Sequence, residues 1–192
     1  LNYSQMINKT LYGAVAYDQA FGYLSNYDES MPDNVDPKSE GGSYTVAEHK
    51  WDEAFGYFGA RRDFLNPSAD GDCVDLTSEH NFGWASYATK RDNDTENIAY
   101  RNGVMFKADI FNAFVAGRAI IHNEGTVDEL APHMATIRTR FEQLCAANVV
   151  HYVHSVLNAM SDLTDASDAM SSESESYNKY WSEMRGFIIS LQ

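Results

Sequence analysis

Apolar residues recur at intervals of three and four along most of the chain, the spacing of an α-helix with one buried face. No segment alternates between apolar and polar residues for long enough to predict a β-strand. The fold is therefore predicted to be all-α, an up-and-down helical bundle of about five main helices. The expected helices cover residues 2–25, 45–58, 98–122 or 103–122, 126–160 or 132–160, and 172–191, with a short helix at 82–90.

The helix limits follow from local signals. Thr45 with Glu48, and Thr126 with Glu129, have the spacing of a capping box. Pro132 should start or kink the longest helix, because proline cannot donate a backbone hydrogen bond. Residues 162–174 are an acidic, serine-rich linker before the last helix.

One phrase occurs twice. Residues 17–24 and 51–58 share five of eight positions, and in both copies the apolar residues fall on one helical face. This predicts two equivalent helices, related by a pseudo-two-fold axis, although a match this short can also arise by chance. Gly22 and Gly56 recur inside these helices, where glycine is unfavourable, so we expect a neighbour to pack closely against each.

The length of 192 residues suits a single helical domain. Leu1 lies within a helical pattern and no initiating methionine precedes it. We therefore expect the chain to be a processed or trimmed part of a longer precursor.

The net charge of −14 argues against a nucleic-acid partner and against an anionic membrane surface. Such a negative charge is typical of proteins from saline environments and of proteins that bind cations. No apolar run is long enough to predict a membrane span. Cys73 and Cys145 could pair, but two cysteines do not establish a disulfide.

The first candidate metal site is His49, Asp52 and Glu53, which share one side of a predicted helix. Imidazole and carboxylate at this spacing can bind a divalent ion such as iron or zinc. The alternative is a structural histidine that is hydrogen-bonded beside Trp51. The pattern is not the His-Glu-x-x-His signature of zinc proteases.

Two further groups are alternatives. His151 and His154 stand one turn apart and could chelate a metal, although His151 also continues an apolar stripe. The acids of one predicted loop suit Ca²⁺ but are equally typical of a solvated loop. These acids are Asp70, Asp72 and Asp75.

Three acids lie on predicted helices, at Asp18, Asp52 and Asp109. Such charges should be paired or exposed, and the candidate partners are Arg118, Arg138 and Arg140. We interpret them as structural ion pairs. No phosphate-binding glycine loop, nucleophile elbow or covalent haem motif occurs, so no catalytic role is predicted.

Residues 44–59 resemble the signature of an uncharacterised family of exported bacterial proteins, many of them marine and often lipoproteins. Residues 88–91, 112–119 and 145–152 extend the match. The resemblance implies an extracytoplasmic location: periplasmic, cell-surface or secreted.

The same segment is more remotely similar to the imelysin family, which consists of periplasmic or surface helical proteins linked to iron uptake. The imelysin motif is Gly-x-His-x-x-Glu, and residues 47–52 match it with alanine for glycine and aspartate for glutamate. Glu53 lies next to that aspartate. This resemblance implies a helical bundle and a link to iron.

The sequence predicts an extracytoplasmic, non-catalytic binding protein for a divalent metal (iron, zinc or calcium) or an iron-containing ligand. The alternative is a self-assembling cell-surface protein, because 12 Tyr and 10 Phe could form subunit interfaces. A metallopeptidase is the third hypothesis.

Overall fold

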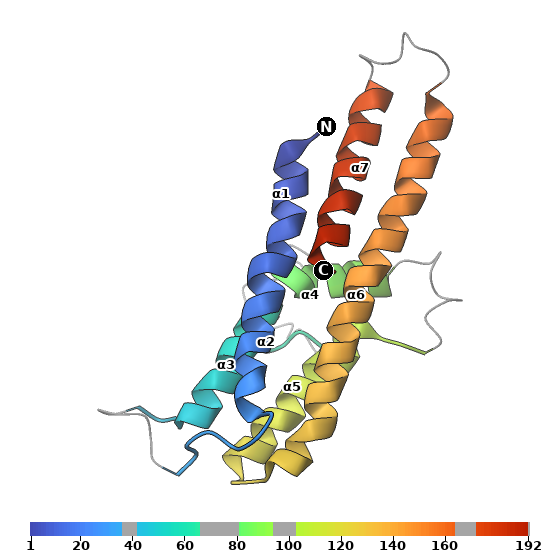
Figure 1. The fold of residues 1–192 in the computed structure, drawn as a ribbon. Coiled ribbons are helices and arrows are strands. Elements are labelled where there is room, and N and C mark those ends of the chain that lie inside the picture. The colour runs from blue at the N-terminus through green and yellow to red at the C-terminus, as the bar shows by residue number, and fades with distance from the viewer. Residues whose placement is uncertain (36–41, 66–80, 94–102, 164–171, 192) are drawn as a thin grey trace. The chain divides into compact units, whose positions relative to one another are not determined.

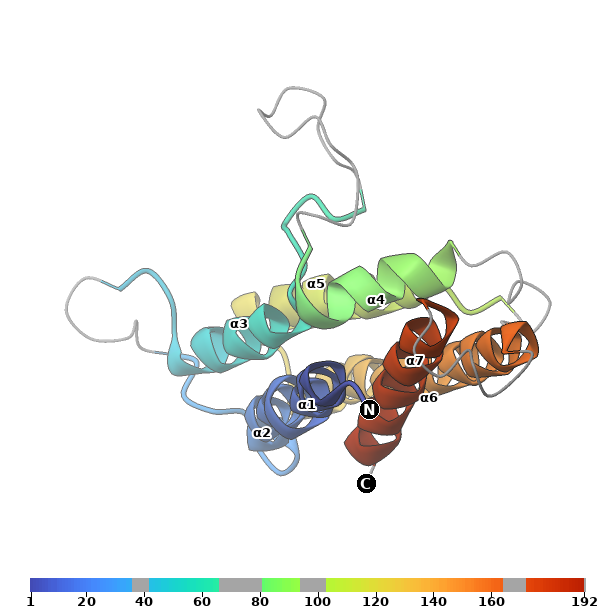
Figure 2. The ribbon, with the colours of Figure 1, turned by 90° about the horizontal axis from the view of Figure 1, so that it is seen from above.

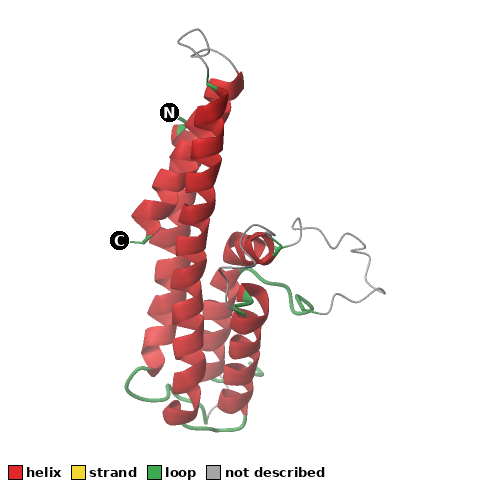
Figure 3. Ribbon diagram, turned by 90° about the vertical axis from the view of Figure 1, so that its right-hand side faces the viewer, coloured by secondary structure: helices red, strands yellow, loops and turns green. Residues whose placement is uncertain are grey.

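The structure is a computed structural model that describes residues 1–35, 42–65, 81–93, 103–163 and 172–191. These residues form helices and connecting loops without a strand, which confirms the predicted all-α bundle (Figure 3). The α-helices are α1 (Tyr3–Leu11), α2 (Asp18–Leu24), α3 (Val46–Phe58), α4 (Gly83–Asp92), α5 (Phe106–His122), α6 (Val127–Asp162) and α7 (Ser172–Ser190) (Figure 1). Within the described ranges, no helix is both long and apolar enough to cross a membrane.

Most predicted limits agree with the structure. The first predicted helix is α1 and α2 joined by a π-helical stretch, η1 (Tyr12–Tyr17), and a short 3-10 turn, η2 (Ser25–Tyr27), follows α2. The longest helix begins before Pro132 and runs through it, so this proline does not start the helix. Helix α5 begins at Phe106, after its N-cap Met105, so the predicted start at residue 103 is too early and residue 98 lies outside the described residues. Most of the predicted linker also lies outside the described residues.

The chain divides into two compact units. Unit 1 consists of residues Leu1–Val15 and Glu142–Gln192, and unit 2 is the continuous segment Ala16–Phe141. The π-helical stretch and α6 each contain a boundary between the units. The single domain expected from the chain length stays a prediction, because units that share helices can belong to one fold.

The two copies of the repeated phrase form α2 and α3 of unit 2, which pack against each other in opposite directions (Figure 1). Equivalent positions of the two copies behave alike: Ala20 and Ala54 are fully buried, and the rings of Tyr23 and Tyr57 stack at 6.1 Å. The two phrases therefore form structurally equivalent, contacting helices.

Aromatic rings fill the core of unit 2. Phe141 is fully buried and its ring lies 5.5 Å from that of Phe58, 5.7 Å from Phe21 and 6.0 Å from Trp84. Rings at these separations add edge-to-face attraction to the burial of apolar area. The first half of α6 is thereby fixed against α2, α3 and α4.

Helix α4 also sets the start of α5. The carboxylate of Asp92, at the end of α4, accepts hydrogen bonds from the backbone N–H of Phe106 (3.0 Å) and of Lys107 (2.8 Å). An acid at this position satisfies free N–H groups and complements the helix dipole. This contact fixes the start of α5 against the end of α4.

In unit 1, α1 and α7 lie side by side (Figure 2). They approach closely because Gly186 on α7 faces Lys9 on α1, and just beyond α1, Gly13 of η1 faces Ser190; a Cβ atom at either glycine would overlap its neighbour. The buried ring of Phe187 on α7 lies 5.9 Å from that of Tyr152 on α6. Helix α7 therefore contacts both of the other helices of its unit.

Candidate functional site

A capping box begins the site at the start of α3. Thr45 Oγ1 accepts a hydrogen bond from the backbone N–H of Glu48 (3.1 Å), and Glu48 Oε2 accepts one from the backbone N–H of Thr45 (2.9 Å). The structure confirms the sequence prediction of this pair. The box holds the Glu48 carboxylate in the first helical turn, where the residue is 5% exposed.

The other oxygen of Glu48 binds groups from α5. Arg118 Nη1 donates to Glu48 Oε1 at 2.5 Å, and His122 Nδ1 lies 3.0 Å from the same oxygen. Burial alone would raise the pKa of Glu48. Hydrogen bonds from His122, the Thr45 backbone and Arg118 have the larger, opposite effect and lower this pKa to about 2. Glu48 is therefore a carboxylate throughout the neutral pH range, with both oxygens occupied.

Arg118 also binds Asp52, one turn beyond Glu48. Its Nε donates to Asp52 Oδ1 at 3.0 Å, so one guanidinium bridges two acids on the same face of α3. The predicted structural ion pairs are confirmed for Asp52, and for Asp109, which accepts from Arg140 Nε at 2.7 Å. These pairs join α3 to α5 and α5 to α6.

A close approach of α3 to α5 occurs at Gly117. Trp51 Nε1 donates to the backbone carbonyl of Phe114 (2.8 Å), and a Cβ atom at Gly117 would lie 2.0 Å from Trp51 Cζ2. By contrast, Gly22 and Gly56 are exposed, and nothing described lies within 4 Å of a Cβ placed on either. The predicted close packing at these two glycines is therefore wrong.

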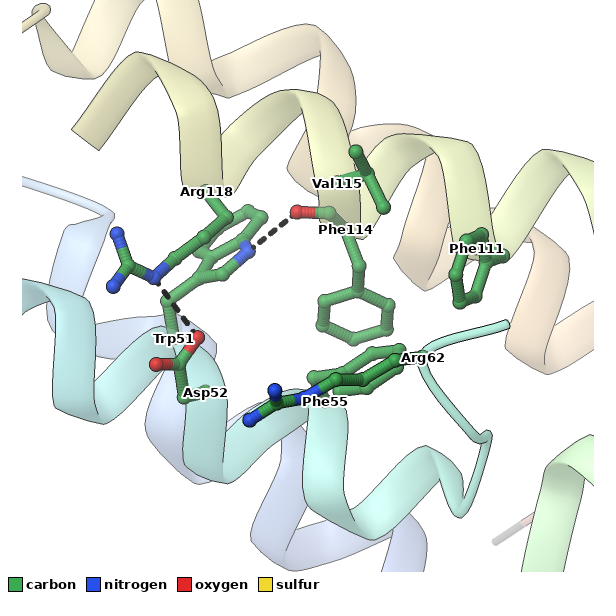
Figure 4. Close-up of a pocket in the computed structure, with 8 residues that line it drawn as sticks. All are labelled: Trp51, Asp52, Phe55, Arg62, Phe111, Phe114, Val115 and Arg118. Atoms are coloured by element: carbon green, nitrogen blue, oxygen red, sulfur yellow. Dashed lines mark hydrogen bonds and ion pairs between the residues drawn. The ribbon is translucent and has the colours of Figure 1, made fainter. Parts of the chain in front are cut away.

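A pocket of about 410 Å³ lies between α3 and α5 in unit 2 (Figure 4). Phe55 lies across from α5, with its ring 5.4 Å from that of Phe114 and 5.8 Å from that of Phe111. Volumes of this size are typical of sites for small organic molecules. The lining residues are Trp51, Asp52, Phe55, Arg62, Phe111, Phe114, Val115 and Arg118.

The two guanidinium groups of the pocket differ in their surroundings. Arg118 is neutralised by Glu48 and Asp52. Arg62 is exposed and lies alongside Phe55, and among the described residues it has no hydrogen-bond or ion-pair partner (Figure 4). The pocket therefore combines an aromatic wall with one positive charge that is not neutralised.

The predicted metal site comes together only in part. His49 Nε2 lies 3.6 Å from Glu53 Oε1, and the His49 ring stacks on Tyr44 at 5.3 Å. Asp52 instead binds Arg118. Across the described ranges, no three His, Cys, Asp or Glu side chains are grouped closely enough to hold a metal ion.

The alternative groups lie elsewhere. His151 is half-buried, with its ring 5.1 Å from that of Tyr152, and His154 is exposed. The loop acids Asp70, Asp72 and Asp75 lie outside the described residues, as does Cys73. Cys145 has a free, buried thiol that donates to the carbonyl of Phe187 at 3.6 Å, and burial raises its pKa to about 12.

Sequence reasoning did not single out Arg62 or His122 for this site, because the residues that each of them approaches come from another part of the chain. Phe114, Val115 and Gly117 belong to residues 112–119, which the family resemblance includes. That match, together with Arg118 as a candidate partner of Asp52, was the signal in the sequence that could have pointed to the α5 side of the pocket.

Comparison with known proteins identifies the chain by family. No curated protein matches it, and no solved structure matches it. One family model covers residues 1–192, and its description is Domain of unknown function (DUF4856). The coverage extends over both units, including the α3–α5 site. The chain therefore belongs to this uncharacterised domain family.

Proposed function

We propose that the protein is a non-catalytic binding protein whose α3–α5 pocket takes a small organic molecule with an aromatic body and an anionic group. The observation that carries this proposal is the positive charge of Arg62, which has no described partner and stands beside an aromatic wall. A ligand carboxylate or sulfonate would neutralise this charge.

The wall supports an aromatic ligand body. Phe55, Phe111 and Phe114 present ring faces and edges, and Val115, which is 52% exposed, adds an aliphatic surface. A planar ring can stack or pack edge-on against such rings, at a gain of about 0.5–1.5 kcal/mol for each pair.

The charges favour an anion over a cation. The acid among the lining residues, Asp52, binds Arg118, and Glu48, one turn earlier on α3, binds three donors. A cationic ligand in the pocket would be repelled by the guanidinium groups of Arg62 and Arg118, whereas an anion can bind Arg62 with the existing ion pairs intact. The acidic network then acts as a rigid support for the pocket.

Binding of a divalent metal at His49 and Glu53, which do not line the pocket, is a second and separate proposal. Its support is the His49–Glu53 pair, with both side chains about one-third exposed (34% and 39%), so that water could supply further ligands. An extracytoplasmic location and the likeness to imelysin are also proposals, and they rest on the resemblance of residues 44–59 and 47–52.

Calorimetric titration with naphthoate and with its uncharged analogue naphthamide tests the proposal. We expect the wild-type protein to bind naphthoate about tenfold more tightly than naphthamide, because a charge-assisted hydrogen bond to Arg62 adds to ring packing. In Arg62→Gln, the two probes should bind with equal affinity, and the affinity for naphthamide should be unchanged.

Arg138→Gln is the matched control. It removes the same charge from unit 2, but Arg138 binds Asp28 (2.7 Å) and does not line the pocket. This variant should keep the preference for naphthoate. Failure of the wild-type protein to bind either probe would overturn the proposed pocket, and a preference for naphthoate that persists in Arg62→Gln would overturn the role of Arg62.

A further inference from the structure

An apolar stripe follows the second half of α6, in unit 1. Val150 is 49% exposed, Val153 36%, Leu157 58% and Met160 51%. Single exposed apolar residues are ordinary, but four in one row along a helix form a continuous surface. Ala146, which is also exposed, extends the row by one turn.

The spacing of this row is that of a helix-pairing seam. The four residues are separated by three, four and three positions, which is the alternation of a and d sites in a coiled coil. The spacing three, four, three is the same from the N-terminal end of the row as from its C-terminal end. A second copy of the helix, running the opposite way, would therefore present the same row, with Val153 opposite the partner's Leu157.

The charge distribution indicates what can approach this surface. Residues 143–161 contain no Asp, Glu, Lys or Arg, although the whole chain carries a net charge of −14. Two strongly acidic chains could meet here without placing like charges in contact. A surface helix that binds anionic membranes carries Lys or Arg beside its apolar face, and this segment has none.

We propose that the stripe Val150, Val153, Leu157 and Met160 is the interface of a homodimer in which two α6 helices pair in antiparallel fashion about a two-fold axis. Such an interface is isologous, so the same patch serves both copies. With one helix from each copy the contact area is small, and the dimer should dissociate in the micromolar range. This inference concerns unit 1 and is independent of the pocket in unit 2.

Sedimentation velocity across the micromolar range tests the dimer. The wild-type chain should shift from monomer to dimer as the concentration rises. Leu157→Glu should remain monomeric at all concentrations, because it places acids within the apolar contact. Asn158→Glu is the matched control: it adds the same charge at the next, exposed position, outside the row, and should dimerise like the wild type.

Cysteine crosslinking tests the orientation. In a Cys73→Ser background, the double variant Val153→Cys with Leu157→Cys should form disulfide-linked dimers, and Leu157→Cys alone should not. Efficient crosslinking of the single variant would overturn the antiparallel arrangement.

Three results would overturn the interface itself. They are a wild-type chain that is monomeric throughout, a dimer that Leu157→Glu leaves intact, and binding of the monomer to phosphatidylcholine vesicles that Leu157→Glu abolishes. The last result would assign the stripe to a membrane surface.

Discussion

The two units each bury a glutamate on a helix, but they surround it differently. In unit 2, Glu48 on α3 has hydrogen-bond partners for both oxygens, from Thr45, Arg118 and His122. In unit 1, Glu183 on α7 has one ionic contact, with Lys9 Nζ at 3.5 Å from Oε1. Its Oε2 has no hydrogen-bond partner among the described residues.

The number of hydrogen bonds to each buried carboxylate decides how much that glutamate contributes to the free energy of unfolding. A buried charge that is fully hydrogen-bonded recovers much of its lost hydration, whereas a buried pair at long distance recovers less. Lys9 and Glu183 are 8% and 4% exposed, and Lys9 Nζ also donates to Asn8 Oδ1 at 3.0 Å, whereas the desolvation of Glu183 is offset by its pairing with Lys9. The hydrogen bonds of Glu48 therefore offset its desolvation more fully than the single ionic contact offsets that of Glu183.

The largest expected effect comes from breaking the pair in unit 1. Lys9→Met leaves the Glu183 carboxylate buried without its cation and should lower the free energy of unfolding by about 3–5 kcal/mol. The double variant Lys9→Met with Glu183→Leu should be close to the wild type or more stable, because no charge remains to be desolvated. Urea unfolding measures both. A double variant as unstable as the single one would show that the pair stabilises unit 1.

A pH series sharpens the comparison from the side of unit 2. The pKa of Glu48 lies at about 2, below its ordinary value of 4.5, so its contribution is complete above about pH 5 and is lost as the pH falls towards 2. The stability advantage of the wild type over Glu48→Gln should shrink by on the order of 2 kcal/mol across this window. Other carboxyl groups titrate in both proteins, so the quantity to follow is the difference in unfolding free energy between the wild type and Glu48→Gln at each pH. A difference that stays constant from about pH 5 to about pH 2 would contradict the proposed contribution of the Glu48 hydrogen bonds.

The smallest effect compares a crowded glycine with an open one, both in unit 2. Gly117→Ala places a methyl group against the Trp51 ring and should lower the free energy of unfolding by about 1–3 kcal/mol. Gly56→Ala meets nothing described within 4 Å and should raise it by up to about 1 kcal/mol, because alanine favours the helix. Thermal unfolding measures both. Equal shifts would mean that Trp51 adjusts freely.

Local signals in the sequence predicted the helices and the cap at Thr45, because helical periodicity and capping depend on residues a few positions apart. The partner of Asp52 was also among the candidates, since a charge on a helix should be either paired or exposed. The pocket was not predictable in this way. The pocket depends on which faces of α3 and α5 pack against each other. Arg62 becomes a pocket residue only because those two faces form the pocket beside it.

The glycines illustrate the same limit. Gly22 and Gly56 stand out within the repeated phrase, yet both are exposed. Gly117 stands in an ordinary helical pattern, yet the Trp51 ring occupies the space beside it. A local sequence pattern shows where a glycine is unusual. Whether a glycine is needed for packing depends on a residue of another helix, as Trp51 shows for Gly117.

The division of the chain has a consequence for the order of events during synthesis. Unit 2 is one continuous segment, but unit 1 joins the first 15 residues to a segment that begins at Glu142. Ser190 Oγ donates to the carbonyl of Lys9, 181 positions earlier in the chain. At ribosomal rates, on the order of ten seconds or more separate the emergence of these partners. Helix α1 is therefore synthesised before the whole of unit 2, and it can pack against α7 only after unit 2 has been made.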